Sequence, residues 1–367
     1  MFSVPTTSPA TVGGRAVSPL PAKVRIAAIG GGTGLPNVLR GLCSLLYAGS
    51  TRQQPGDAGA DQLVAVVTTT DDGGSSGRLR RDFGVIPPGD IRNCLAALAE
   101  DQSLLTALFQ YRFEGSDGLN GHALGNLMLT ALTEVTGDFV KAVEIAARVV
   151  GARGRVVPAT VDQVVLSAEL VDGRTVSGET AIVAAGSPIR RLSLHPAEPR
   201  CVDTALDALR RADVIVVGPG SLYTSLLPPL LMPEILEAVR LADAARVLVL
   251  NLMTEPGETA DFDAARHLEV VEEHLGFQPF DHVIFNTAPI PAHLSSWYAE
   301  RGAAPIVVSN ADIARFRGLG VQPLGAPLAS EGPSGRVRHH PGRLAATVLA
   351  AARLAPRQPL PFREGSH

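Results

Sequence analysis

The chain has 367 residues, of which 46% are apolar and 19% charged, and its formal net charge is −4. This composition is typical of a globular protein with one large domain or two smaller ones. A basic block occurs only at Arg78, Arg80 and Arg81, which argues against a nucleic-acid partner. The three cysteines form no CxxC pair, which excludes the usual zinc and redox motifs and favours a reducing compartment.

The two ends of the chain differ in composition from its centre. Residues 1–22 are rich in Pro, Ser, Thr and Gly without an apolar signal core, so we expect a disordered extension. We expect residues 23–355 to form a single α/β domain and residues 356–367 a flexible tail. The uncharged stretch 214–232 is interrupted by glycines and prolines, so we expect no membrane span.

The first half of the chain alternates apolar runs with helical patterns. Val24–Ile29 and Leu63–Val67 predict buried strands of a parallel sheet. Helices are predicted at 35–47, 90–100 with Asp90 as N-cap, 103–109, 122–136 and 139–149. The alternation indicates a Rossmann-like, mostly parallel sheet with helices on both faces.

Residues 155–195 follow a different pattern. Short β-like runs at 164–170, 181–185 and 189–194, with a hairpin signal at Asp172-Gly173, predict a small antiparallel β insertion. The parallel α/β pattern then resumes. Strands are predicted at 213–217, 246–250, 282–285 and 305–308, and helices at 233–242, 261–275 and 343–354.

Polar loops follow several of the predicted strands. Gly30–Leu35 reads GGGTGL, and similar loops begin at Gly218, Asn251 and Asn286. Such loops bind phosphates at the carboxyl ends of parallel strands, although a tight turn alone would also require glycine. GGGTGL lacks the lysine of a Walker A loop and the third glycine of a dinucleotide fingerprint. Phosphate binding and a purely structural turn therefore both remain open.

The segment 68–93 carries the densest polar chemistry. Asp71 and Asp72 follow a predicted strand, and adjacent residues of an extended chain point to opposite sides. Both are candidate catalytic residues. Asp72 would ligate Mg²⁺, act as a base or bind a ribose, and the alternative is a loop-capping aspartate. Arg78, after a small-residue loop at 73–77, is a candidate phosphate clamp, and Asn93 would face the same cleft.

His122 and Asn126 lie four residues apart at the start of a predicted helix and therefore on one face. This pair is a candidate part of the site, and a structural histidine is the alternative. The remaining histidines have no metal-ligand spacing.

Seven strings of the sequence, in order, resemble one family: GGGTGL, TTTDDGGSSGRLR, PPGDIRN, GHALGNLMLTAL, GPGSLYTSLLPPLL, NLMTEPGET and HHPGRLA. They are similar to the bacterial gluconeogenesis factor family, related to 2-phospho-L-lactate transferase of deazaflavin coenzyme synthesis, over residues 24–350. The resemblance implies a Rossmann-like cytoplasmic protein that binds UDP-N-acetylglucosamine and serves cell shape and wall synthesis during gluconeogenic growth. One departure is Pro229, where the family often has asparagine.

The resemblance also implies which residues contact the ligand. These are Gly31, Gly32, Thr33, Asp72, Ser75, Ser76, Asn126, Gly218, Gly220, Ser221, Asn251, Thr254 and Asn286. The alternative function is a Mg²⁺-dependent phosphotransferase of the 2-phospho-L-lactate transferase type, acting on a nucleotide-diphosphate donor. Whether the chain is an enzyme, requires Mg²⁺ or forms homo-oligomers stays open at this point.

Overall fold

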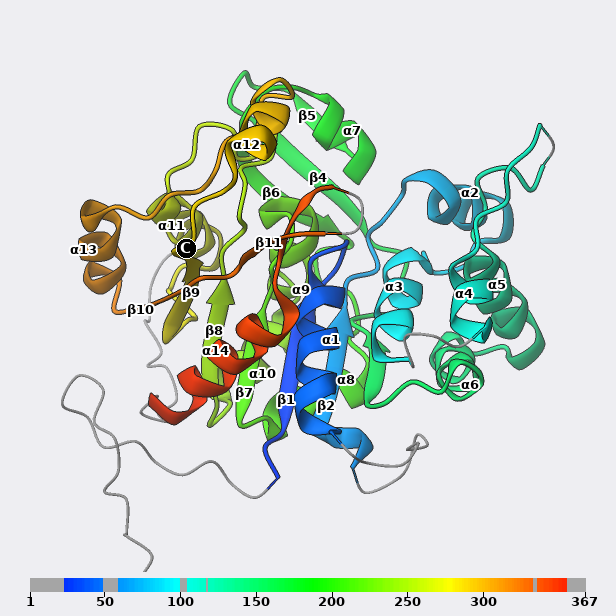
Figure 1. The fold of residues 1–367 in the computed structure, drawn as a ribbon. Helices are drawn as coiled ribbons and strands as arrows, with labels where there is room; N and C mark the ends of the chain where they lie inside the picture. Colours follow the sequence, from blue (N-terminus) through cyan, green and yellow to red (C-terminus); the bar gives the residue numbers. More distant parts are fainter. Residues whose placement is uncertain (1–22, 49–58, 100–103, 117, 333–334, 355–367) are drawn as a thin grey trace, which may run out of the picture.

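A seven-stranded parallel sheet forms the centre of the protein, in a computed structural model that describes residues 23–48, 59–99, 104–116, 118–332 and 335–354 (Figure 1). The strand order is β10-β9-β8-β7-β1-β2-β3. The strands are β1 Ile26–Gly30, β2 Leu63–Val67, β3 Arg155–Pro158, β7 Val214–Val217, β8 Ala245–Val249, β9 His282–Asn286 and β10 Gln322–Ala326. This confirms the Rossmann-like α/β prediction. The predicted N-terminal extension and C-terminal tail lie outside the described residues.

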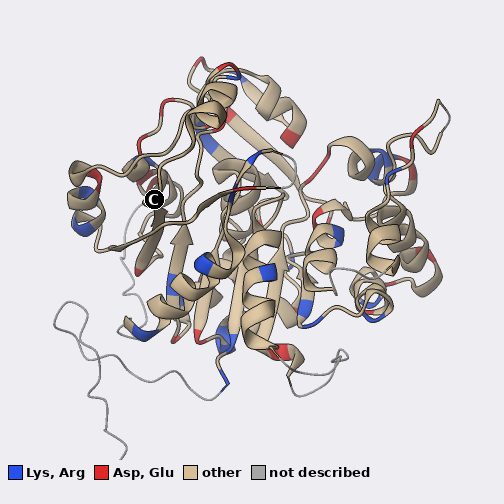
Figure 2. Cartoon of the chain, in the orientation of Figure 1, with Lys and Arg blue, Asp and Glu red and all other residues tan. Residues whose placement is uncertain are grey.

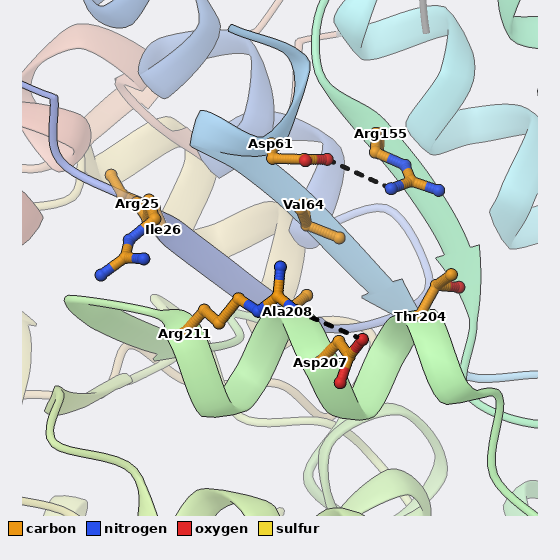
Figure 3. A pocket seen from close by; sticks show the side chains of 9 residues that line it. All are labelled: Arg25, Ile26, Asp61, Val64, Arg155, Thr204, Asp207, Ala208 and Arg211. Carbon is orange, nitrogen blue, oxygen red and sulfur yellow. Dashed lines mark hydrogen bonds and ion pairs between the residues drawn. The ribbon is translucent and has the colours of Figure 1, made fainter. Parts of the chain in front are cut away.

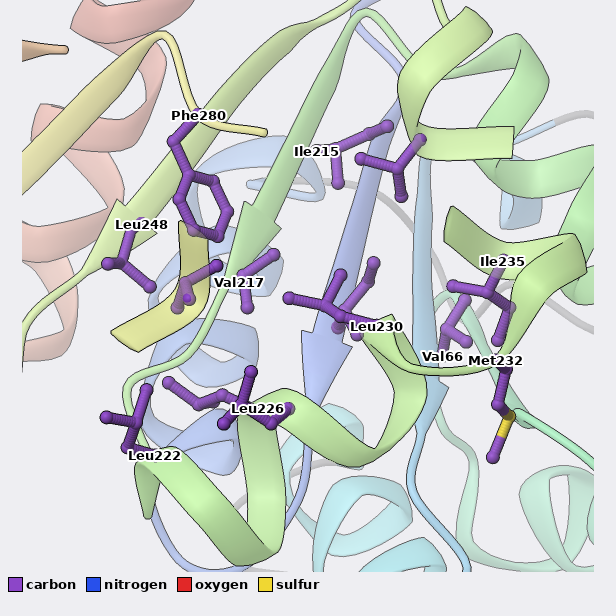
Figure 4. Close-up of a cluster of buried hydrophobic side chains, with 14 of the residues drawn as sticks. Val66, Ile215, Val217, Leu222, Leu226, Leu230, Met232, Ile235, Leu248 and Phe280 are labelled. Carbon is purple, nitrogen blue, oxygen red and sulfur yellow. The ribbon is translucent and has the colours of Figure 1, made fainter. Parts of the chain in front are cut away.

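Helices bury both faces of the sheet, as parallel strands require. One face is covered by α1 Leu35–Leu46, α3 Gly89–Leu98, α6 Phe139–Val150 and α14 Pro341–Leu354. The other is covered by α8 Asp203–Arg211, α9 Leu227–Leu230, α10 Pro233–Leu241 and α11 Ala264–Leu275. Ile215 and Val217 of β7 pack on the second face with Leu226, Leu230 and other side chains (Figure 4), while Val214 and Val216 pack on the first. This alternation is the two-residue period of a strand.

The predicted antiparallel insertion is present and contains β4 Val165–Leu170, β5 Thr175–Ser177 and β6 Ile189–His195, in the order β5-β4-β6. Residues 155–158 are not part of it, because they form the edge strand β3 of the central sheet. The predicted β-like run at 181–185 is wrong: these residues belong largely to helix α7, Glu179–Ala184. Only Ile182 of this helix is buried, so its apolar composition reflects a short helix on the sheet rather than a pairing strand.

Three further expectations are also wrong. Residues 305–308 form no strand and contribute only an isolated bridge between Pro305 and Met253, consistent with the missing N–H of proline. The small-residue segment 73–77, expected to be a loop, begins helix α2, Gly74–Phe83. Asp90 lies in the first turn of α3 but makes no capping hydrogen bond there.

The remaining elements complete the described part of the fold. They are η1 Ala60–Gln62, α4 Leu104–Gln110, α5 Leu124–Thr136, η2 Leu222–Leu226, α12 Ala292–Ala299, α13 Asn310–Gly318 and the antiparallel pair β11 Ala329–Glu331 and β12 Val337–His339. The β11–β12 pair follows β10 and returns the chain to α14 (Figure 1). Among the described helices, none has the length and apolar character needed to cross a membrane.

Candidate functional site

Two loops meet at the carboxyl end of the central strands β1 and β7. A Cβ atom added to Gly34 would lie 2.2 Å from the carbonyl oxygen of Pro219, so only glycine permits this approach. The Gly218-Pro219 peptide bond is cis, and Gly218 has a φ of 79°. Helix α1 starts directly after Gly34, which directs free N–H groups toward the same edge of the sheet.

Two neighbouring cavities open beside these loops. The first, of about 420 Å³, is lined by the loops after β1, β7 and β8 and also by Glu179 and Tyr298. The second, of about 680 Å³, extends toward α3 and β11 and reaches Asn93. Both share Thr33, Asn37, Arg338 and His339 as lining residues. Their volumes are in the range of small-molecule and cofactor sites.

An acidic group lies behind the β1 loop. The amide of Gly32 donates a 2.7 Å hydrogen bond to Oδ2 of Asp90. Burial and the neighbouring Asp71 raise the pKa of Asp90 to about 6. Burial and, to a smaller extent, the charges of Asp71 and Asp90 raise the pKa of Glu179 to about 9. At neutral pH this carboxyl group is therefore protonated and adds no charge to the cavity wall.

The loop after β8 forms a second polar wall. Asn251 accepts from the amide of Gly220 at 3.0 Å and donates to its carbonyl at 2.8 Å, fixing the β7 loop. Ser221 donates a hydrogen bond to Glu258 and accepts one from the amide of Thr224. Burial raises the pKa of Glu255, which lines the first cavity, to about 7.

The two adjacent aspartates face different surroundings, as expected. Asp71 accepts from the amide of Gly73 at 2.9 Å, which is the loop-capping geometry considered as the alternative. Asp72 accepts from both the amide and the hydroxyl of Thr180 in α7, at 2.9 and 2.6 Å. Asp72 also lines a third cavity, of about 860 Å³, between α2 and the β insertion, together with Arg80. Asp72 thus links the central domain to the insertion.

His122 and Asn126 do come together, and Ser75 joins them. Asn126 Nδ2 donates to Ser75 Oγ at 3.0 Å, which leaves the Ser75 hydroxyl to donate to His122 Nδ1, 3.1 Å away. Ser76 accepts from the amide of Gly89. All three members of the first group are buried, so they lie behind the surface rather than in either cavity.

The structure thus separates the predicted ligand residues into two groups. Those that line the first two cavities are Gly32, Thr33, Gly220, Ser221, Asn251 and Asn93. Those outside their lining are Gly31, Ser75, Ser76, Arg78, Asn126, Gly218, Thr254 and Asn286, with Asp72 in the third cavity. Thr254 accepts from the amide of Ala304, and Asn286 accepts from the amides of Ala288, Leu328 and Ala329. These two side chains hold loops together.

Sequence reasoning missed Arg338, Tyr298, Asn37 and Glu179 as cavity residues. Arg338 lies in β12, far along the chain from every polar loop, and only its position next to the HHPGRLA string could have indicated it. His339 of that string is buried, donates to the carbonyl of Leu250 and has a pKa lowered to about 4 by burial. It is neutral and structural at neutral pH.

The described residues contain no group of three or more acidic, histidine or cysteine side chains arranged as metal ligands. Mg²⁺ does not require such a cluster, because it usually binds one or two carboxylates together with phosphate oxygens and water. Asp72 fits this role in part, since Thr180 occupies its Oδ1 atom while, among the described residues, its Oδ2 atom accepts no hydrogen bond.

A further cavity of about 300 Å³ lies at the opposite, amino-terminal edge of the sheet (Figure 3). Its three arginines each have a carboxylate partner: Arg25 with Asp213, Arg155 with Asp61 and Arg211 with Asp207. Because these cations are already neutralised, this cavity is a weaker candidate for an anionic ligand than the carboxyl edge.

Comparison with known proteins identifies relatives of the chain. The chain is 44% identical over 300 residues to the gluconeogenesis factor of Bacillus subtilis, covering 82% of this chain and 89% of that protein. It is 39% identical over 327 residues to the gluconeogenesis factor of Halalkalibacterium halodurans, covering 89% and 96%. A crystal structure of a Bacillus halodurans protein superposes with a TM-score of 0.81 at 39% identity, covering 89% of this chain and 99% of that one. The family model described as 2-phospho-L-lactate transferase CofD matches residues 26–329. The chain therefore belongs to the 2-phospho-L-lactate transferase CofD family.

Proposed function

We propose that the protein binds a nucleoside-diphosphate-linked ligand across the two cavities at the carboxyl edge, with the phosphates between Thr33 and Arg338. The proposal rests on the position of Arg338. Its guanidinium lines both cavities, and among the described residues it has no hydrogen-bond or ion-pair partner of its own. A guanidinium at the junction of two cavities is suited to a phosphate or diphosphate, which it binds through two parallel hydrogen bonds.

The glycine loops complete this phosphate site. Gly34 and Gly220 let the loops after β1 and β7 pack closely at this edge, and the N-terminus of the 12-residue helix α1 contributes a favourable dipole. Tyr298 is half-buried at the wall of the first cavity, where its ring would pack against a sugar or a base. The ligand's two ends would then occupy the two cavities.

The family match favours a transferase of the 2-phospho-L-lactate transferase type. Such an enzyme would transfer a phosphorylated acid from a nucleotide-diphosphate donor, chiefly through positioning and electrostatics. Asp72 would hold Mg²⁺ together with the ligand's phosphates, and the ion would neutralise developing charge. The third cavity, beside Asp72, is large enough to take an acceptor.

The relatives named gluconeogenesis factor favour a second candidate. In this version the ligand is UDP-N-acetylglucosamine, bound without turnover in the cytoplasm, and the protein serves cell shape and wall synthesis during gluconeogenic growth. The engagement of Asp71 by Gly73 and of Asp72 by Thr180 supports binding without chemistry, because both carboxylates already have internal partners.

Calorimetric titration tests the shared binding site. We expect saturable binding of UDP-N-acetylglucosamine or of a guanosine diphosphate compound, weakened about tenfold or more by Arg338→Ala because a bidentate charged contact is lost. Arg336→Ala is the matched control, since Arg336 is exposed two residues away and faces the Trp297 ring at 5.7 Å. Equal affinities of the two variants would show that the ligand's phosphates do not bind at this edge of the sheet.

Turnover separates the two candidates. The protein is incubated with Mg²⁺, a guanylylated phospho-acid donor and a deazaflavin acceptor, and release of nucleotide is followed by chromatography. Nucleotide release that Asp72→Asn abolishes and Asp82→Asn preserves would establish the transferase. An unchanged donor, alongside tight binding of UDP-N-acetylglucosamine, would establish the binding protein.

A further inference from the structure

Three arginines from different segments converge at the junction of α2, α3 and α5. Arg78 donates to the carbonyl of Asn120 at 2.7 Å, and Arg112 donates to the carbonyl of Gly121 at 2.5 Å. Arg92 donates to the side chain of Asn93 at 2.6 Å. All three acceptors are neutral, and within the described residues none of these arginines forms an ion pair. This contrasts with the paired arginines of the amino-terminal cavity in Figure 3.

The charges of this group act on one another. Burial lowers the pKa of Arg92, and the charge of Arg112 lowers it further. Burial also lowers the pKa of His122, with Arg78 the largest charged contributor. The charges of Asp90 and Asp71 raise the pKa of Arg92, although neither carboxylate bonds to it. Figure 2 shows basic segments on α2 and α3, in a chain whose net charge is −4. Positive charge is therefore concentrated here without direct neutralisation.

Beneath the arginines lie buried polar atoms that have no partner. Asn126 is 2% exposed and its Oδ1 atom accepts no hydrogen bond. Arg92 is 8% exposed and its Nε donates none, and Arg78 Nε is likewise unpaired. A Cβ atom added to Gly125 would lie 2.9 Å from Arg92 Cγ, so the start of α5 lies directly on this arginine. Unpaired buried polar groups are rare, because each has lost its hydrogen bonds to water without gaining a replacement.

We propose that this junction is a second anion site, in which Arg78, Arg92 and Arg112 bind a phosphate or carboxylate group. The unpaired Nε atoms supply donors, and Asn126 Oδ1 accepts from a protonated oxygen of the ligand, as in hydrogen phosphate or a hydroxy acid. The Ser75–His122 pair forms the floor and keeps Asn126 in place. The inference does not depend on the nucleotide site, because it uses none of the residues that line the first cavity.

Phosphate titration tests this site. Thermal unfolding of the full chain is followed in millimolar orthophosphate or lactate against chloride at equal ionic strength. We expect phosphate to raise the melting temperature if the source is free phosphate, and the hydroxy acid to raise it if the source is an organic acid group. Arg112→Gln should reduce either rise in melting temperature about fivefold or more, because the substitution removes a charge from the site. Arg112 is exposed, so its replacement leaves no cavity in the core. Arg317→Gln, an exposed arginine of α13, should not reduce the rise.

A second variant keeps the test independent of folding defects. Asn126→Asp would place a carboxylate at the start of α5, which packs on Arg92, at nearly unchanged volume. We expect it to raise the melting temperature in chloride and to abolish the response to added anion. A response to neither anion in the parent chain, or equal responses of Arg112→Gln and Arg317→Gln, would overturn the proposal. Titration of Arg112→Gln with the nucleotide ligand is expected to match the parent, which separates the two sites.

Discussion

The carboxylate of Asp90 accepts a 2.7 Å hydrogen bond from the amide of Gly32, joining the first turn of α3 to the loop after β1. The contact requires Gly31, because a Cβ atom there would lie 2.5 Å from Asp90 Oδ2 and 2.4 Å from Thr68 Cγ2. An amide that the sequence assigned to a phosphate is therefore already bound by a carboxylate. The phosphates of the proposed ligand are expected farther along the loop, at Thr33 and Arg338.

Gly31→Ala should destabilise the fold. The added methyl group would collide with Asp90 and Thr68, so we expect the free energy of unfolding to fall by about 1–3 kcal/mol. Urea denaturation followed by circular dichroism measures this. Gly318→Ala is the control, since Gly318 lies in α13 with open space around its Cβ position, and alanine favours a helix. Equal destabilisation by both changes would contradict the steric explanation.

Asn286→Ala should lower stability rather than ligand affinity. The Oδ1 atom of Asn286 accepts from the amides of Ala288, Leu328 and Ala329, at 3.1, 2.9 and 2.9 Å. Its removal leaves these backbone donors unpaired, and we expect a loss of about 2 kcal/mol or more. Denaturation and ligand titration are measured on the same variant. A large loss of affinity at unchanged stability would instead support the ligand contact implied by the family resemblance.

Thr180→Val should loosen helix α7. The substitution removes the hydroxyl that donates to Asp72 at 2.6 Å while keeping the size of the side chain. We expect faster hydrogen exchange of the amides of 179–184, because the insertion loses part of its link to the central domain. Thr175→Val provides the comparison, since Thr175 is an exposed residue of β5. Unchanged exchange in α7 would show that the Asp72 contact does not hold this helix.

Stability should fall as pH rises from 7 to 9. Burial raises the pKa of Glu179 to about 9, far above that of an unfolded chain, whereas Glu255, with a pKa raised to about 7, affects stability mainly below this range. The folded state therefore binds protons that the unfolded state has already lost. As a result, the free energy of unfolding falls as pH increases. Melting temperatures across this range measure the effect.

Glu179→Gln is the control for this pH dependence. It should flatten the profile near pH 9 because glutamine carries the neutral form permanently. Below about pH 6.5 the buried histidines His267, His274 and His339 act in the opposite direction, since their lowered pKa values favour the neutral ring. A melting temperature that rises steadily from pH 7 to 9 would contradict the assignment.

Much of the fold could be predicted from local patterns. Apolar runs such as Leu63–Val67 are buried along their whole length, and a strand buried on both faces must read in this way. The errors occur where tertiary contacts outweigh local preference. Ala181–Ala185 has β-like composition but is largely helical, because Asp72 binds the first turn of α7 from 108 residues away. Residues 73–77 look like a loop, yet Gly77 packs against the Asp72 carbonyl inside α2.

The sequence by itself determined the parallel α/β fold, the glycine-rich loops after its strands and the kinship of the chain, because these depend on residue type and order. Only the tertiary structure decided which polar groups are available to a ligand. Asp90, Asn251 and Asn286 are polar residues of the expected kind, but each is already bound to backbone amides. Arg338 gave no local signal, and it faces both cavities because β12 returns across the carboxyl edge. Whether a polar group is available to a ligand depends on hydrogen-bond partners that are distant in sequence. No local sequence pattern encodes these partners.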